Sequence, residues 1–217
     1  AFIDIGLERA AFLHIVDVLE QRRNPDETQR IEHMLFEGQS VLVQVIKDPI
    51  NTKGARLSTQ ISLAGRFLVH LPQEDHIGIS QRIEDDAERS SLRERLNNLL
   101  PENACHGYII RTNAENASDD QLQSDINYLT KVWEHIQKQA KIQPPETMLY
   151  QDLPLSLRVL RDMFSLDTHK ILVDSTENHR RMTQFAEQYV QGALGRIELF
   201  KGERPLFETH NIEQEIA

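Results

Sequence analysis

The residues best suited to chemistry in this chain fall into three groups, and the first is aromatic and basic. Phe2 and Phe12 lie in short apolar runs, and Lys53 lies in the turn-like stretch 49–54. Single-stranded nucleic acid is commonly held by aromatic faces that stack on bases and by cations that contact phosphates. Spacing alone favours the alternative, in which both phenylalanines are buried in a core and Lys53 is a solvated turn residue.

The second group is Arg111 with Thr112, directly after the apolar run 107–110. A guanidinium can hold phosphate oxygens through two parallel hydrogen bonds, and a threonine hydroxyl can add a third. The neighbourhood is acidic, because residues 73–128 hold 5 Lys+Arg against 12 Asp+Glu, a net charge of -7. Composition therefore favours the alternative, an exposed pair or an arginine that is paired with a nearby acid.

The third group consists of carboxylates that could hold a metal ion for hydrolysis. They are Asp85, Asp86, Asp119, Asp120, Asp152 and Asp174. The two adjacent pairs each begin a predicted helix, where negative charge is favourable, so we expect helix-terminal roles rather than a metal site. Cys105 and His106 are excluded as a nucleophile and base, since neighbours on a strand point to opposite faces.

Composition indicates a globular chain of one large or two small domains. The 217 residues are 39% hydrophobic and 27% charged, with a net charge of -10. No apolar run is long enough to span a membrane. The one cysteine cannot form an internal disulfide, which is typical of a cytoplasmic protein.

The elements that must position these groups follow from local patterns and predict a mixed α+β chain. In the first third, four strands, one short helix and a loop at Asn24-Pro25 predict a small barrel of the OB type. The strands are expected at 1–6, 10–15, 40–48 and 55–63, and the helix at 30–39.

Farther along, the middle third is predicted to alternate strands with two helices. Strands are expected at 64–72, 76–80 and 107–110, and a helix within 82–100 carries Leu92, Leu96 and Leu99. Ser118 and Gln121 form a capping-box pattern that opens a long helix. Its apolar stripe is Leu122, Ile126, Leu129, Trp133 and Ile136. The last third predicts helix and strand in alternation, with Ser175 as an N-cap and a final helix from about Thr209.

Together the motifs resemble those of the ribonuclease E/G family. The segments that carry the resemblance are "AFIDIGLERAAFLH", "GQSVLVQVIKDPINTKGARLSTQISLAGRFLVHLP", "HIGISQRIEDDAER" and "GYIIRTNAEN". It continues in order through "WEHIQ", "LYQDLPLSLRVLRD" and "GERPLF", so it covers essentially the whole chain. The form "IKDPINTKGARLS" is nearer to the G branch of that family.

The resemblance implies an endoribonuclease that cleaves single-stranded RNA in rRNA maturation and mRNA decay and prefers a 5′-monophosphate. It implies a partial S1-type OB domain at 1–62, a 5′-sensor domain at 63–150 and a partial ribonuclease H-like subdomain at 151–217. A homo-oligomeric parent protein would hold Mg²⁺ on two aspartates of a DNase I-like domain beyond residue 217, with a zinc-sharing cysteine pair after it. We therefore expect this chain to be a fragment that does not cleave RNA by itself.

Site residues also follow from the resemblance. The RNA-stacking rings would be Phe2 and Phe12, which reverses the core interpretation, and the RNA-contacting lysine would be Lys53. The 5′-phosphate pocket would comprise Gly65, Val69, Arg111 and Thr112. Two alternatives remain open at this point: a non-catalytic protein-interaction or RNA-binding module, and a self-sufficient nuclease that uses the carboxylates above.

Overall fold

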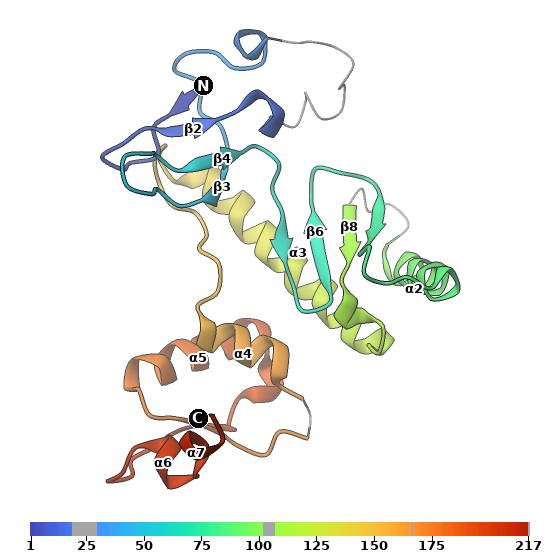
Figure 1. Cartoon of the computed structure of the whole chain (residues 1–217), viewed down its shortest axis with the longest axis vertical. Helices are drawn as coiled ribbons and strands as arrows, with labels where there is room; N and C mark the ends of the chain where they lie inside the picture. Colours follow the sequence, from blue (N-terminus) through green and yellow to red (C-terminus); the bar gives the residue numbers. More distant parts are fainter. Residues whose placement is uncertain (19–29, 102–106, 166, 217) are drawn as a thin grey trace. The chain divides into compact units, whose positions relative to one another are not determined.

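The computed structural model describes residues 1–18, 30–101, 107–165 and 167–216 (Figure 1). Contacts divide the chain into two compact units, Ala1–Tyr150 and Gln151–Ala217. Each unit contains both helices and strands, so the predicted α+β class is confirmed. The loop signal at Asn24-Pro25 and the Cys105-His106 pair lie outside the described residues.

The first unit begins with a four-stranded sheet whose strand order is β1-β2-β4-β3. Its strands are β1 (Phe2–Ile3), β2 (Ala11–Leu13), β3 (Gln44–Lys47) and β4 (Arg56–Ser58). β1 is antiparallel to β2 and β3 is antiparallel to β4, whereas β2 and β4 run parallel. One face is closed by a core of Ala11, Leu13, Val18, Ala55 and Leu57.

All five predicted elements of this region are shorter than the sequence patterns indicated, and the strand 55–63 and the helix 30–39 lose the most residues. The expected strand 55–63 ends at Ser58, because the backbone amides of Gln60, Ile61 and Ser62 bond to side chains rather than to a neighbouring strand. Gln44, for example, accepts a hydrogen bond from the Ser62 amide at 2.8 Å and donates one to the Ser62 carbonyl at 3.0 Å. The expected helix at 30–39 is a single 3-10 turn, Ile31–His33.

A second four-stranded sheet follows, with the strand order β5-β6-β8-β7. Its strands are β5 (Leu63–Ala64), β6 (Leu68–Leu71), β7 (Ile77–Ile79) and β8 (Gly107–Ile110). Helix α3 (Asp119–Ile142) packs against β5 and β6, and helix α2 (Asp86–Leu99) packs against β7 (Figure 1). Leu92 and Leu96 of α2 are fully buried, as the helical spacing predicted.

Residues 64–72, predicted as one strand, form a hairpin instead. The Gly65 amide donates to the Leu68 carbonyl at 2.8 Å, so Gly65, Arg66 and Phe67 make the turn between β5 and β6. This turn, which we call the β5–β6 turn, also receives the chain that leaves β8. The Arg111 amide donates to the Phe67 carbonyl at 2.9 Å.

Helix α3 begins with the predicted capping box. The Ser118 hydroxyl accepts from the Gln121 amide, and the Gln121 side chain accepts from the Ser118 amide at 2.9 Å. Of the predicted apolar stripe, only Trp133 is not buried, and Val132 is buried beside it. A bulky indole at the margin of the stripe remains half exposed, whereas the smaller valine packs into the core.

The second unit combines helices with a two-stranded parallel sheet. Its elements are α4 (Leu155–Met163), β9 (Ile171–Val173), α5 (Thr176–Tyr189), β10 (Ile197–Leu199), α6 (Leu206–Thr209) and α7 (Ile212–Ile216). Helix α5 connects β9 to the parallel β10, as a βαβ unit requires. Ser175 caps α5, as predicted, by accepting from the Asn178 amide at 3.2 Å. The described helices include none that could cross a membrane.

Tyr108 on β8 gives a pH-dependent prediction for the first unit. Burial raises the pKa of its hydroxyl above the usual value of 10, since the charged form would lose its solvation. The unfolded chain therefore releases this proton at a lower pH than the folded chain, and stability falls as pH rises above about 10. We expect Tyr108→Phe to remove part of this decline. Urea unfolding between about pH 8 and about pH 11 measures the free energy of unfolding of both proteins. If that free energy falls equally with pH in the unmutated chain and in Tyr108→Phe, the prediction is wrong.

Candidate nucleic-acid interface

Two exposed phenylalanine rings lie side by side on the first sheet. Phe2 of β1 and Phe12 of β2 are register partners, and their ring centroids are 5.7 Å apart with an interplanar angle of 56°. Phe2 is 77% exposed and Phe12 is 39% exposed, whereas Ala11 and Leu13 on either side of Phe12 are buried. Alternation along β2 thus turns Phe12 away from the core. The core interpretation that spacing favoured is wrong for both rings.

His14 extends this surface and was missed from the sequence. Its ring lies 5.9 Å from the Phe12 ring, with an interplanar angle of 60°. Its Nδ1 accepts a hydrogen bond from the Val16 amide at 3.3 Å, which orients the imidazole. Because residues two apart on a strand share a face, the spacing of Phe12 and His14 was the available signal. Phe2, Phe12 and His14 are called the aromatic surface below.

Lys53 lies in a tight turn beside the same part of the chain. Its amide donates to the Ile50 carbonyl at 2.9 Å, and Asn51 inside the turn has a left-handed φ of 51°. Arg9 Nη1 donates to the Asn51 carbonyl at 3.1 Å, so a second exposed cation is fixed to this turn. A Cβ on Gly54 would collide with the Ala10 carbonyl, so only glycine lets the turn lie this close to β2.

A separate group of polar contacts surrounds the β5–β6 turn in the second sheet. Arg111 follows β8 and bonds to the turn twice: its amide donates to the Phe67 carbonyl, and its Nη1 donates to the Gly65 carbonyl. Its side chain is half-buried, and the ion pairs found in the described part of the chain do not include it. The alternative of an arginine paired with a nearby acid therefore has no support among these residues.

The two other predicted pocket residues, Thr112 and Val69, lie on segments next to Arg111. Thr112 directly follows Arg111 and begins a 3-10 turn, Thr112–Ala114, with its side chain half-buried. Val69 of β6 pairs with Ile109 of β8, two residues before Arg111, and is also half-buried. The structure thus joins Gly65 to Arg111 by a hydrogen bond and places Thr112 and Val69 on the adjoining segments.

A buried carboxylate lies on the other side of the β5–β6 turn. Asp125 of α3 is 5% exposed and accepts hydrogen bonds from three consecutive backbone amides. The donors are Arg66 at 3.0 Å, Phe67 at 2.8 Å and Leu68 at 2.8 Å. Asp125 was not predicted as a site residue, although an acid inside the apolar stripe between Leu122 and Ile126 was a signal for it.

Three of the six carboxylates considered for a metal site have other roles. Asp85 is the N-cap of α2 and accepts from the Ala87 amide at 2.9 Å. Asp119 accepts from Arg95 at 2.8 Å, and Asp152 pairs with Arg158 at 2.7 Å. Within the ranges that the structure describes, no three His, Cys, Asp or Glu side chains gather where a metal ion could bind.

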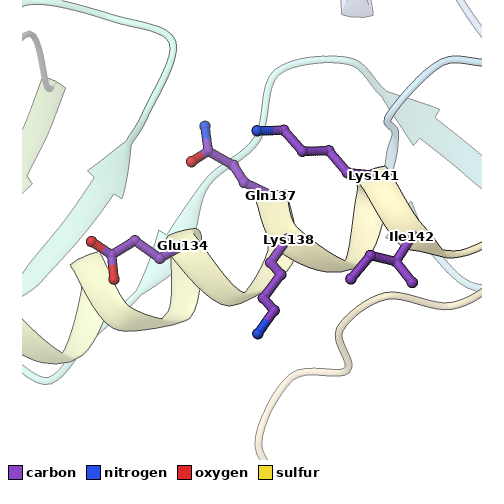
Figure 2. A pocket seen from close by; sticks show the side chains of 5 residues that line it. All are labelled: Glu134, Gln137, Lys138, Lys141 and Ile142. Atoms are coloured by element: carbon purple, nitrogen blue, oxygen red, sulfur yellow. The ribbon is translucent and has the colours of Figure 1, made fainter.

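A hollow on α3 includes neither the aromatic surface nor the residues around the β5–β6 turn. It has a volume of about 320 Å³ and is lined by Glu134, Gln137, Lys138, Lys141 and Ile142. Figure 2 shows these side chains spreading outward from the helix in different directions rather than converging on one point. No predicted site residue is among them.

Comparison with known proteins relates the whole chain to ribonucleases. Residues 62–217 match the model of the Ribonuclease E/G family. The chain is 37% identical over 223 residues to Ribonuclease G of Escherichia coli (strain K12) and 35% identical to Ribonuclease G of Haemophilus influenzae. It is also 37% identical over 228 residues to Ribonuclease E of Escherichia coli (strain K12).

These alignments cover 100% of this chain but only part of each relative. The chain spans 45% of both Ribonuclease G proteins and 21% of the Escherichia coli Ribonuclease E. The family model covers well over half of the 217 residues, and the identity extends over their full length. The chain therefore belongs to the ribonuclease E/G family.

Proposed function

We propose that this chain is the RNA-binding and 5′-monophosphate-sensing part of a ribonuclease G-like endoribonuclease. The observation that carries the RNA-binding part is the cross-strand pair of exposed rings, Phe2 and Phe12. Exposing two adjacent phenylalanines to water is unfavourable unless a partner covers them. Family membership names RNA as the expected partner, because the relatives are ribonucleases.

In this proposal, residues 1–62 form an S1-type OB domain that binds single-stranded RNA. Bases stack on Phe2 and Phe12, and Lys53 contacts the phosphates between them. The Ile50–Lys53 turn supports this role, because it keeps the lysine exposed next to the segment that leads into β2. Single-stranded regions of rRNA precursors and mRNA are the proposed substrates.

Residues 63–150 would form the 5′-sensor domain, in which Arg111 and Thr112 bind the terminal phosphate. A guanidinium has five N–H donors, and the bond from Nη1 to the Gly65 carbonyl uses one of them. The remaining donors suit a phosphate, and Gly65 and Val69 would shape the pocket. The net charge of -7 over residues 73–128 repels RNA generally, so a phosphate that meets several donors at once is favoured over one that does not.

Cleavage is proposed for the parent protein rather than for this chain. We propose that Mg²⁺ is held by residues outside 1–217 and that 151–217 is a ribonuclease H-like subdomain without catalytic acids. The helix-capping and ion-pairing contacts of Asp85, Asp119 and Asp152 support only the view that these three acids do not hold the metal. Zinc binding and oligomer formation are likewise proposals for the parent protein.

Salt-dependent binding tests the RNA-binding proposal. We expect the chain to bind a single-stranded oligonucleotide, with the logarithm of the association constant falling linearly against the logarithm of salt concentration. Lys53→Ala should reduce the slope by about 0.7, the value for one lost phosphate contact on a single strand. Fluorescence anisotropy at several salt concentrations measures both slopes.

The matched control is Lys201→Ala, which removes an exposed lysine from the second unit. Its slope should equal that of the unmutated chain. Absence of binding at low salt would contradict the proposed function. If Lys53→Ala binds RNA with an unchanged salt slope, only the proposed phosphate contact of Lys53 is wrong, and the RNA-binding proposal stands.

A further inference from the structure

The buried carboxylate of Asp125 connects helix α3 to the predicted phosphate pocket. We infer that Asp125 is a positioning residue for this pocket: it fixes the β5–β6 turn, which in turn fixes Arg111. The inference rests on the proposed 5′-sensing function. In this role Asp125 does not contact the RNA. It acts through the backbone of the β5–β6 turn, which lies between Asp125 and Arg111.

The first step is that the Asp125 carboxylate and the backbone N–H groups of the turn are hydrogen-bond partners. A buried ionised carboxylate is costly unless hydrogen bonds compensate for the lost water. Three consecutive amides of the turn supply them, at 3.0, 2.8 and 2.8 Å. Hydrogen bonds to a charged acceptor are stronger than those between neutral groups. The backbone of Arg66, Phe67 and Leu68 is therefore held in one conformation.

The second step concerns the glycine at position 65. A Cβ there would lie 2.5 Å from Asp125 Oδ2 and 2.6 Å from Oδ1, far inside van der Waals contact. In contrast, a Cβ on Gly78 in the same sheet would meet its nearest neighbour, Ile109, at 3.5 Å, which is an ordinary contact. Gly65 is therefore required by the carboxylate, and the two residues form one structural unit.

The third step is that the same turn holds Arg111 from its other side. The carbonyls of Gly65 and Phe67 accept hydrogen bonds from the Arg111 side chain and amide, respectively. Since Asp125 fixes the N–H groups of this turn, it also fixes the direction of these carbonyls. A guanidinium whose orientation is set in advance loses less entropy when it binds a ligand.

A consequence follows for ligand selection. Consecutive backbone N–H groups in a turn commonly bind anions, but here the carboxylate already occupies three of them. These three amides are therefore not available to a terminal phosphate, whereas the Arg111 side chain, which is held at the same turn, can contact one. Asp125 thus keeps these amides from binding an anion and also fixes the turn that holds Arg111.

Asp125→Asn tests the inference with little change in shape. The amide keeps one oxygen acceptor but turns an NH₂ group toward backbone N–H donors, so at least one bond is lost. We expect the preference for a 5′-monophosphate over a 5′-hydroxyl oligonucleotide to disappear, while affinity for the 5′-hydroxyl form stays unchanged. The matched control is Asp120→Asn, an exposed acid in the first turn of the same helix, which should keep the preference.

Amide hydrogen exchange on the unmutated chain is independent of whether the variant folds. If Asp125 fixes the turn, the amides of Arg66, Phe67 and Leu68 are strongly protected in the absence of RNA. Exchange of these amides at the rate of an unbonded loop would overturn the inference. So would a folded Asp125→Asn variant that retains the full 5′ preference.

The two proposals fail in different ways. If the unmutated chain binds both oligonucleotides equally although the three amides are protected, 5′-sensing is wrong and the inferred role in sensing falls with it. If the unmutated chain has the preference and Asp125→Asn keeps it, 5′-sensing stands and only the role of Asp125 is wrong.

Discussion

Phe12→Ala is expected to weaken binding of single-stranded RNA by about 5- to 150-fold, which corresponds to about 1–3 kcal/mol for one stacked base. The ring is partly exposed on the outer face of β2, while Ala11 and Leu13 on the inner face remain to hold the strand. The variant should therefore fold. Filter binding with a labelled single-stranded oligonucleotide measures the change.

Phe2→Ala is expected to act in the same direction, and the double variant should lose less than the sum of the two effects. The rings contact each other at a centroid distance of 5.7 Å, so each single substitution also disturbs the partner ring. Phe207→Ala serves as the control, because it removes an exposed phenylalanine from the second unit. Equal affinities for the unmutated chain and the Phe2/Phe12 double variant would show that RNA does not use this surface.

Arg111→Lys is expected to abolish the preference for a 5′-monophosphate even though the positive charge remains. Lysine offers a compact point charge, whereas the guanidinium fork can bond to the Gly65 carbonyl and to a phosphate at the same time. Affinity for a 5′-hydroxyl oligonucleotide should change little, because the aromatic surface does not include Arg111. Competition between the two oligonucleotides measures the preference.

Arg93→Ala is the matched control for this experiment, since Arg93 is an exposed arginine on α2 of the same unit. It should keep the preference of the unmutated chain. If Arg111→Lys also keeps it, charge alone is sufficient and the bidentate geometry is not used. If Arg111→Ala keeps it as well, the pocket lies elsewhere.

Elements specified by local sequence were predicted well. The helical spacing of Leu92 and Leu96 and the capping box of Ser118 and Gln121 need only neighbouring residues, and both are confirmed. The β5–β6 turn was missed because Gly65 lies within an alternating pattern that reads as one strand. Its conformation depends on Asp125, 58 positions from Phe67 in the sequence, and local patterns carry no such information.

Local sequence patterns were also insufficient to predict the candidate site. Spacing favoured a core position for Phe2 and Phe12 and was wrong, since both faces of a strand repeat every two residues and the pattern does not say which face is buried. The family resemblance predicted exposure, and the structure confirms that both rings are exposed. Arg9 was not found, because its place beside Lys53 depends on how the turn meets the start of β2. His14 was missed although its spacing from Phe12 was a local signal.

The most direct test of the central claim compares two oligonucleotides on the unmutated chain. They share one unstructured sequence and differ only in a 5′-monophosphate or a 5′-hydroxyl, and their dissociation constants are measured at the same low salt concentration. We expect the monophosphorylated RNA to bind more tightly. Equal dissociation constants, or no binding of either RNA, would contradict it.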